Sequence, residues 1–280
     1  MKQVTFDSIY KDFEQLLISS HYSTHTVRAY LGQLRAFLKV TAPKSPSELS
    51  TKEIKAYIAN LVKAGSSRSI IDQAVNSLHF LYSEVFKHPV PLRDMQRPAS
   101  KRNAPVILTG EEVCRIADAT GNLKHKLIIL LAYTAGLRIS EVVNLQVRDF
   151  DHDNLTISVR GSGKRRNRTT IFSEILLSPI QTITQGKNPF CYLFTGYKGK
   201  PLTPRAVSKL FKIALEASGI GKTATPRTLR HSFTALILES GVDLKIAQKL
   251  LGHTRSDVTS YYSNLWLNLD PDSKMEIYPQ

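Results

Sequence analysis

A proline-rich segment divides the sequence and limits how the chain can fold. Residues 91–105 read PLRDMQRPASKRNAP, with three prolines, four basic side chains and little apolar content. Proline has a fixed φ and no backbone N–H, so regular helix or sheet does not continue through such a segment. We expect two domains, residues 1–92 and 107–280, joined by a basic linker, residues 93–106. A basic linker suits a chain that crosses a phosphate backbone; a solvated tether without contacts is the alternative.

The residues before the linker show only helical periodicity. Apolar side chains recur at helical spacing in residues 6–17, in residues 27–38 and again from Ile70 to Val85. Ser50, followed three residues later by Glu53, has the spacing of a capping box and predicts the start of another helix. The first domain is therefore expected to consist of helices alone.

The second domain is predicted to be mainly α with a small β-sheet. Thr109 and Glu112 have the spacing of a second capping box. Residues 155–159 and 169–172 are typical of two short strands around a basic turn. Helical patterns cover residues 111–119 and 123–135, and further helices are predicted from Thr203 with Pro204 in the first turn, and from Thr228, Asp243 and Arg255.

The charge balance favours a polyanionic partner. Lys and Arg number 38 against 23 Asp and Glu, which gives a formal charge of +15 over 280 residues. Nucleic acid is the first candidate partner and an acidic membrane surface the second. Two cysteines do not make a disulfide framework, and the apolar run at residues 127–133 is shorter than the roughly 20 residues that span a bilayer. We expect a soluble cytoplasmic protein without a signal peptide or a membrane partner.

Residues 224–264 carry a pattern that suits the cleavage of DNA by a tyrosine. They contain Arg230, His253 and Tyr262 in that order. A phosphodiester gains negative charge as it is attacked, so a metal-free site must supply fixed cations and hydrogen-bond donors. Arginine and histidine do this, and tyrosine supplies the nucleophile. Each residue alone would more often be structural, and their joint order carries the hypothesis.

Two upstream segments add candidate cations. Arg138 lies three residues before Glu141, which can orient it, although such pairs are most often surface pairs of little energetic value. Lys164 lies in the basic turn RGSGKRRNRT, from where a lysine can protonate a leaving oxygen; a solvated turn is the alternative. The GSGK run lacks the glycine spacing of a nucleotide-binding loop, and Arg165 stands where Ser or Thr would bind magnesium, so ATP binding is rejected.

These motifs resemble the tyrosine recombinase, or phage integrase, family over almost the whole chain. STHTVRAYLGQLRAFL resembles a helix of its core-binding domain, LTGEEVCRI the entry to its catalytic domain, and TAGLRISEVVNL the segment of its first arginine. The resemblance implies a helical core-binding domain followed by a mixed α/β catalytic domain. It assigns catalytic roles to the first arginine, the hairpin lysine, the second arginine, the LGH histidine and the nucleophile, here Arg138, Lys164, Arg230, His253 and Tyr262.

One position departs from the family pattern. The residue three before the second arginine is usually histidine, less often lysine, and here it is Arg227. A guanidinium stays charged, with a pKa above about 12, so Arg227 suits phosphate binding but not proton exchange. Tyr261 precedes Tyr262, and adjacent helical side chains point about 100° apart, so only one can face the site. The family spacing from His253 selects Tyr262.

The resemblance also implies a mechanism and partners. Tyr262 would form a 3′-phosphotyrosyl bond on double-stranded DNA without ATP, metal or another cofactor, in a homotetramer on two DNA sites. A related recombinase or an accessory DNA-bending protein is a further possible partner, and the nucleoid is the expected location. Besides the catalytic set, we expect these residues to contact DNA, mostly at phosphates: Thr24, Arg28, Arg35, Lys101, Arg102, Arg166, Arg168, Arg205, Lys209 and Lys212.

Several alternatives stay open at this point. A catalytically impaired DNA-binding regulator on the same fold is the rival hypothesis, and a relaxing topoisomerase shares the chemistry. Leu265, Trp266 and Leu269 could form an apolar face that docks on a neighbouring protomer or folds back on its own subunit. The sequence does not distinguish integration, excision, dimer resolution and inversion, nor does it give the DNA site.

Overall fold

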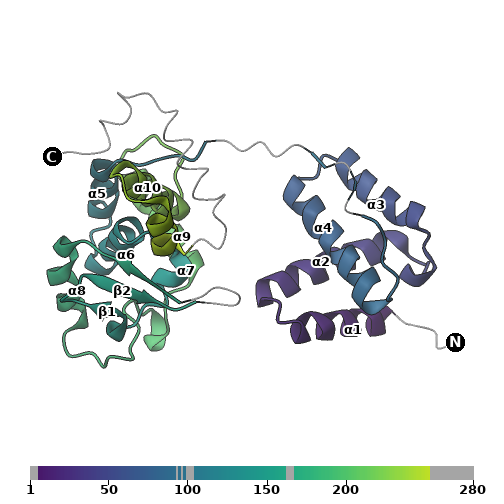
Figure 1. Cartoon of the computed structure of the whole chain (residues 1–280), viewed down its shortest axis with the longest axis horizontal. Helices are drawn as coiled ribbons and strands as arrows, with labels where there is room; N and C mark the ends of the chain where they lie inside the picture. The colour runs from purple at the N-terminus through teal and green to yellow at the C-terminus, as the bar shows by residue number, and fades with distance from the viewer. Residues whose placement is uncertain (1–5, 93, 96, 99–103, 162–166, 253–280) are drawn as a thin grey trace. The chain divides into compact units, whose positions relative to one another are not determined.

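The computed structural model describes residues 6–92, 94–95, 97–98, 104–161 and 167–252. The chain divides into two compact units, residues 1–102 and 103–280 (Figure 1). The division falls inside the segment that was predicted to be a linker. The helix predicted from Arg255 lies outside the described residues.

The first unit is helical, as predicted. Its helices are α1 (Phe6–Ser19), α2 (Thr24–Thr41), α3 (Thr51–Lys63) and α4 (Arg68–Phe80), and α4 continues into a π-helical turn at Leu81–Val85. The capping box before α3 is confirmed, because the Glu53 backbone N–H donates to Ser50 Oγ at 3.3 Å and the Ser50 N–H donates to Glu53 Oε2 at 2.9 Å. The apolar stripes meet in one core that includes Phe13, Phe37 and Leu78.

The beginning of the predicted linker is attached to α4. The Arg97 guanidinium donates from Nη1 to Asp72 Oδ1 at 2.8 Å, and Arg68 Nη1 donates to the Pro98 carbonyl at 2.9 Å. Arg97, which the sequence presented as one of four basic linker residues, therefore carries an ion pair within the first unit.

The second unit is built around one apolar helix. Its helices are α5 (Gly110–Asp118), α6 (Leu123–Thr134), α7 (Ile139–Val142), α8 (Leu177–Thr184), α9 (Pro204–Ala217), α10 (Pro226–Glu239) and α11 (Leu244–Leu251). From Leu127 onwards α6 is apolar on all sides, and the helix packs against α5, α8, α9 and α10, so that this part becomes the centre of the core. No helix in the described ranges is both long and apolar enough to cross a membrane.

Helix starts in this unit follow the predicted local signals. The Thr109–Glu112 capping box is confirmed at α5, and Thr203 Oγ1 caps α9 by accepting from the Ala206 N–H at 3.1 Å. Helix α10 begins at Pro226, two residues before the predicted start, because proline is well suited to the first helical position. Arg227 consequently lies in the first turn of α10.

The small sheet has three antiparallel strands in the order β1 (Phe150–Asp151), β2 (Thr156–Val159) and β3 (Arg168–Ile171). Strands β2 and β3 are the two predicted strands, within one residue at their ends, and they pair with Val159 opposite Arg168. Strand β1, of two residues, was not predicted. The Thr170 hydroxyl donates to the Ala135 carbonyl at 3.0 Å and joins β3 to the end of α6.

The chain leaves α6 through a glycine that no other residue can easily replace. Gly136 has φ of +57°, and a Cβ at this position would lie 2.1 Å from Phe233 Cδ1 of α10. The left-handed backbone conformation and the close approach of Phe233 both exclude a side chain. The turn therefore brings its backbone against α10.

We predict that Gly136→Ala lowers the free energy of unfolding much more than Gly121→Ala. Gly121 has nearly the same φ, +59°, but no atom lies within 4 Å of a Cβ built there. Both changes carry the left-handed strain of roughly 1–2 kcal/mol, and only Gly136→Ala adds overpacking of about 1–3 kcal/mol. Urea denaturation of both variants measures the difference; equal losses would contradict the close packing of Gly136 on Phe233.

Candidate active site

A buried carboxylate, Glu141 of α7, lies among three guanidinium groups. Arg138 Nη1 and Arg168 Nη1 both donate to Glu141 Oε1 at 2.8 Å, and Arg168 Nη2 donates to Oε2 at 3.0 Å. Arg230 Nη1 lies 4.0 Å from Oε2. Only 9% of the Glu141 side chain is exposed. We call Glu141, Arg138, Arg168 and Arg230 the arginine cluster.

Arg138 is held by its backbone as well as by its side chain. It precedes the first residue of the short helix α7, and its N–H donates to Glu141 Oε2 at 2.8 Å. The carboxylate therefore caps the helix and pairs with the guanidinium of the same arginine. The predicted orienting role of Glu141 has this physical basis, and the pair is partly buried, unlike the surface pair that is the common case.

Arg230 is anchored to two backbone carbonyls. Its Nη1 donates to the Gly136 carbonyl at 2.5 Å and its Nη2 to the Leu251 carbonyl. The side chain is 8% exposed, whereas Arg227, one turn earlier on α10, is exposed. The two arginines lie on one helix as predicted, but only Arg230 belongs to the arginine cluster.

Arg168 lies in a different environment from the basic hairpin surface that the sequence suggested. It is the first residue of β3, and its side chain is 9% exposed. Its Nη1 and Nη2 each donate to one oxygen of Glu141, and we call this two-bond contact the fork-shaped pair. Its Nε donates to the Leu250 carbonyl at 2.8 Å. The contacts join residues 27 and 82 positions apart, so no local pattern in the sequence could have indicated them.

The end of α11 completes the arrangement. The carbonyls of Leu250, Leu251 and Gly252 accept from Arg168, Arg230 and Arg138, the last at 3.5 Å. Cations are favoured at a helix C-terminus, where the unpaired carbonyls carry partial negative charge. Gly252 ends the helix in the left-handed conformation, with φ of +60°, which is a common role of glycine. His253, the predicted site histidine, is the next residue in the sequence.

Burial and neighbouring charges shift the pKa of two residues, Glu141 and His231. Burial raises the pKa of Glu141, but hydrogen bonds and charge from Arg168, with help from Arg138, outweigh it and hold the pKa at about 2. Burial, followed by the charges of Arg227 and Arg230, lowers the pKa of His231 to about 4. Glu141 is therefore ionised and His231 neutral at pH 7, and three guanidiniums against one carboxylate leave an excess of positive charge.

Comparison with known proteins identifies the family. Residues 107–266 match the phage integrase family, and residues 9–92 match the phage integrase N-terminal SAM-like domain. The chain belongs to the phage integrase family. An integrase/recombinase of Escherichia coli is 30% identical over 289 residues, covering 88% of this chain and 86% of that protein. Tyrosine recombinase XerA of Pyrococcus horikoshii is 31% identical over 271 residues, covering 94% and 91%.

The fold agrees with this family assignment. A lambda integrase tetramer bound to a Holliday junction has a TM-score of 0.74 at 20% sequence identity, covering 97% of this chain and 80% of that chain. The predicted fold class, mainly helical with a small sheet in the two-domain recombinase architecture, is confirmed. Among the described residues of this phage integrase family member, no group of His, Cys, Asp and Glu is arranged to hold a metal ion.

The remaining predicted site residues fall into two groups. Residues of the first group are exposed on helices: Thr24, Arg28 and Arg35 on α2, and Arg205, Lys209 and Lys212 on α9. Arg35 also donates to Tyr10 Oη at 3.2 Å, and Lys212 Nζ lies 3.7 Å from Glu216 Oε1. The second group lies outside the described residues and comprises Lys101, Arg102, Lys164, Arg166, His253 and Tyr262, together with Tyr261 and the tail residues Leu265, Trp266 and Leu269.

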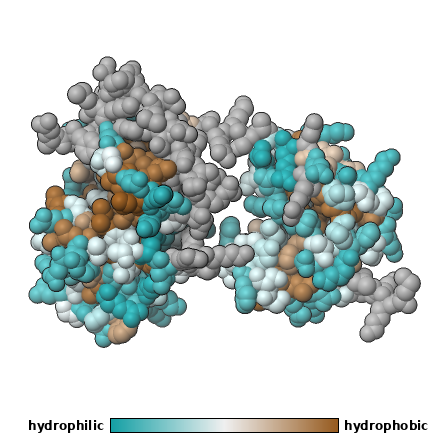
Figure 2. Space-filling model, viewed as in Figure 1, coloured by the Kyte–Doolittle hydropathy of each residue, from teal (hydrophilic) through white to brown (hydrophobic). Residues whose placement is uncertain are grey.

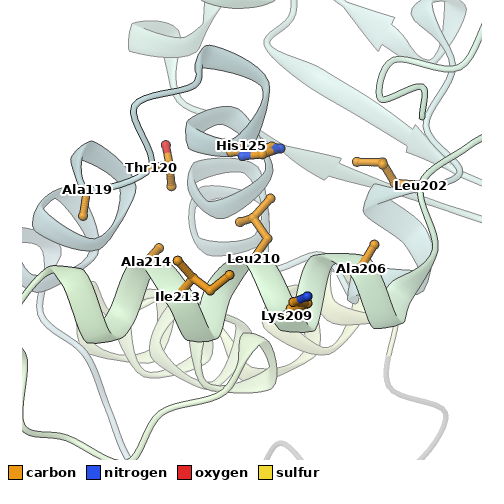
Figure 3. A pocket seen from close by; sticks show the side chains of 9 residues that line it. All are labelled: Ala119, Thr120, His125, Leu202, Ala206, Lys209, Leu210, Ile213 and Ala214. Carbon is orange, nitrogen blue, oxygen red and sulfur yellow. The ribbon is translucent and has the colours of Figure 1, made fainter. Parts of the chain in front are cut away.

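An apolar pocket of about 360 Å³ shares no residue with the arginine cluster. Hydrophilic residues cover much of the face seen in Figure 2, with hydrophobic areas between them. In the pocket, Leu210, Ile213 and Ala214 of α9 face His125 of α6 and the end of α5 (Figure 3). Lys209 also lines it, so one predicted DNA contact lies at the edge of an apolar surface.

We predict that the stabilising effect of Glu141 persists until strongly acidic pH. Its folded pKa of about 2 is below its ordinary value of 4.5, so its contribution is complete above pH 4.5 and is lost as the pH falls towards 2. Glu141→Gln should lower the free energy of unfolding by about 3–5 kcal/mol at neutral pH, and this difference should shrink below pH 4.5.

Urea denaturation of the wild type and the variant between pH 3 and pH 7 measures this difference. Glu216→Gln is the control, because it removes an exposed ion pair with Lys212 that contributes roughly 0–1 kcal/mol. A Glu141→Gln effect as small as the control, or one that grows as the pH falls, would contradict the buried ion pairs.

Proposed function

We propose that this chain is a site-specific DNA recombinase that cleaves and rejoins DNA through a 3′-phosphotyrosyl intermediate. The observation that carries the proposal is the arginine cluster. Glu141 gathers the guanidiniums of Arg138 and Arg230 at the end of α11, immediately before His253 in the sequence. Fixed positive charge of this kind stabilises an attacked phosphodiester, which gains negative charge in the transition state.

In the proposed reaction, Tyr262 loses its hydroxyl proton to solvent as its Oη bonds to the phosphorus, and the bond between the phosphorus and the 5′ oxygen breaks. Lys164 gives a proton to the departing oxygen, His253 donates a hydrogen bond to the phosphate, and Arg138 and Arg230 stabilise the added charge. The phosphotyrosyl bond conserves the energy of the broken bond, so rejoining by a second 5′ hydroxyl requires no ATP, metal or other cofactor.

Arg227 gives the proposed site a permanent positive charge at a position where it lacks a group that exchanges protons near pH 7. It is exposed in the first turn of α10, where the family pattern usually has histidine. A guanidinium keeps its charge and can bind a nonbridging phosphate oxygen, but it cannot exchange a proton near pH 7. Neighbouring His231 is a poor substitute, because the pKa of its imidazole, about 4, lies far below neutral pH.

The proposed partner is double-stranded DNA, bound by a homotetramer across two sites. The formal charge of +15 and the exposed basic residues of α2 and α9 support this. The lambda integrase structure with a similar fold is itself a tetramer bound to a Holliday junction. A related recombinase or a DNA-bending protein could join the complex. The biological reaction would be integration, excision or dimer resolution, at the nucleoid.

We predict that the protein forms a covalent adduct with DNA through Tyr262. The substrate is a library of duplexes with randomised sequence and a nick near the centre. Cleavage close to the nick releases a short piece of DNA that carries the 5′ hydroxyl, and its loss prevents rejoining and traps the adduct. SDS-resistant complexes should form with the wild type and with Tyr261→Phe, and should be absent with Tyr262→Phe. Arg138→Gln should slow adduct formation by about 10²–10³-fold, as expected for the loss of a charge-stabilising donor.

The result that would contradict the proposal is a wild-type protein that binds this library but forms no adduct. That outcome would favour the catalytically impaired DNA-binding regulator. A DNA sequence recovered from the covalent adducts can be placed twice in one plasmid. Relaxed circles without recombinant products from this plasmid would indicate a topoisomerase.

We predict that DNA binding weakens steeply as the salt concentration rises and that basic residues of α9 contribute part of this salt dependence. Each phosphate contact removed should lower the slope of log affinity against log salt by about 1. The test variant replaces Arg205, Lys209 and Lys212 with Gln. A matched control with the same change in charge replaces Lys44, Lys87 and Lys126, which lie outside the two helices expected to contact DNA, α2 and α9. Equal slopes for the two variants would exclude α9 from the DNA interface.

A further inference from the structure

We propose that Arg168 is a positioning residue, which fixes the end of α11 and the carboxylate of Glu141, and that it does not contact DNA. The inference rests on the proposed function, because it concerns how the cleavage site is held together. It replaces the expectation that Arg168 is one more cation on the basic hairpin.

The geometry of Arg168 uses all three nitrogens of the guanidinium. Nη1 and Nη2 donate to the two oxygens of Glu141 at 2.8 and 3.0 Å, and Nε donates to the Leu250 carbonyl at 2.8 Å. The planar fork of arginine matches a carboxylate in this way, and a lysine ammonium cannot form the same set of contacts. One side chain therefore connects β3, α7 and α11.

The last turn of α11 also packs directly on the stem of Arg168. A Cβ built on Gly252 would lie 2.7 Å from Arg168 Cδ and 3.2 Å from its Nε. Gly252 thus allows the left-handed helix end and the arginine stem to come into contact. A side chain at position 252 would therefore displace the stem of Arg168.

The chain flanking these contacts leads to two proposed catalytic residues. Arg168 follows Lys164 by four positions, and Leu250 precedes His253 by three. Through Glu141, the same guanidinium is linked to Arg138. Displacements of about 1 Å in a catalytic group can lower a rate by about 10²-fold. A side chain that fixes the segments next to Lys164 and His253 therefore affects the cleavage rate without touching the substrate.

The fork-shaped pair with Glu141, more than burial, argues against a direct phosphate contact, because Arg230 is just as buried. The side chain of Arg168 is 9% exposed, and the carboxylate that it pairs with is equally buried. Turning the guanidinium towards a phosphate would disturb the fork-shaped pair with Glu141 and the hydrogen bond to the Leu250 carbonyl. Removing one partner from a buried ion pair is strongly unfavourable.

The first test compares Arg168→Met and Arg168→Lys with the matched control Arg115→Met. Arg115 is exposed on α5 and donates to the Ser218 carbonyl at the end of α9, a comparable contact at another helix end. The measurements are the rate of covalent adduct formation, the affinity for the random-sequence duplex, and its salt dependence. We expect Arg168→Met to cleave about 10²-fold more slowly, with affinity and salt slope unchanged. Arg168→Lys should be intermediate, and Arg115→Met should match the wild type.

A salt slope reduced by about 1 in Arg168→Met would overturn the proposal, because it would reveal a lost phosphate contact. Adduct formation at the wild-type rate in either Arg168 variant would overturn it as well. Should Arg168→Met fail to fold, Arg168→Lys supplies the same comparison. If the wild type itself formed no adduct, the proposed function would be wrong, and the result would not concern the role of Arg168.

The second test needs neither DNA nor activity. Gly252→Ala should lower the melting temperature in the wild-type background and lower it less in an Arg168→Ala background, where the arginine stem is gone. Identical shifts in the two backgrounds would overturn the contact between Arg168 and the end of α11, whatever the reaction catalysed.

Discussion

The buried carboxylate of Glu141 is the interaction on which the rest of the site depends. Guanidiniums repel one another, and Arg138, Arg168 and Arg230 can share a small buried space only because an ionised carboxylate lies among them. The same carboxylate caps α7 through the Arg138 N–H, so the backbone and the charges are fixed together. The pKa of Glu141, about 2, keeps this counter-ion charged at every physiological pH.

The helical frame supplies the remaining partners of the cluster. Apolar α6 forms the centre of the second unit, and the turn that leaves it presents the Gly136 carbonyl to Arg230. Helix α11 ends against the same arginines with its carbonyls. A core helix, a helix end and a buried ion cluster thus act as one unit. The three guanidiniums retain excess positive charge, which suits the phosphodiester chemistry proposed for this phage integrase family member.

Local signals in the sequence predicted much of the fold but not the contacts of the site. The capping boxes at Ser50 and Thr109 span three residues, so they could be read from spacing alone. Strand β1 has too few residues for a periodic pattern. The candidate arginines could be chosen from motifs, yet the burial of Arg168 depends on Glu141 and Leu250, far away in the sequence. From the sequence alone, an arginine in a solvated turn cannot be distinguished from an arginine that begins a strand packed on α11.

If Glu141 holds the arginine cluster together, a double-mutant cycle with Arg168 should show strong coupling between the two side chains. The free energy of unfolding is measured for the wild type, Glu141→Gln, Arg168→Met and the double variant. The buried, fork-shaped pair predicts a coupling energy of about 2 kcal/mol or more, within the range of about 0.5–3 kcal/mol seen for contacting residues. A coupling energy of about 0.3 kcal/mol, typical of an exposed ion pair, would contradict a buried ion pair between Glu141 and Arg168.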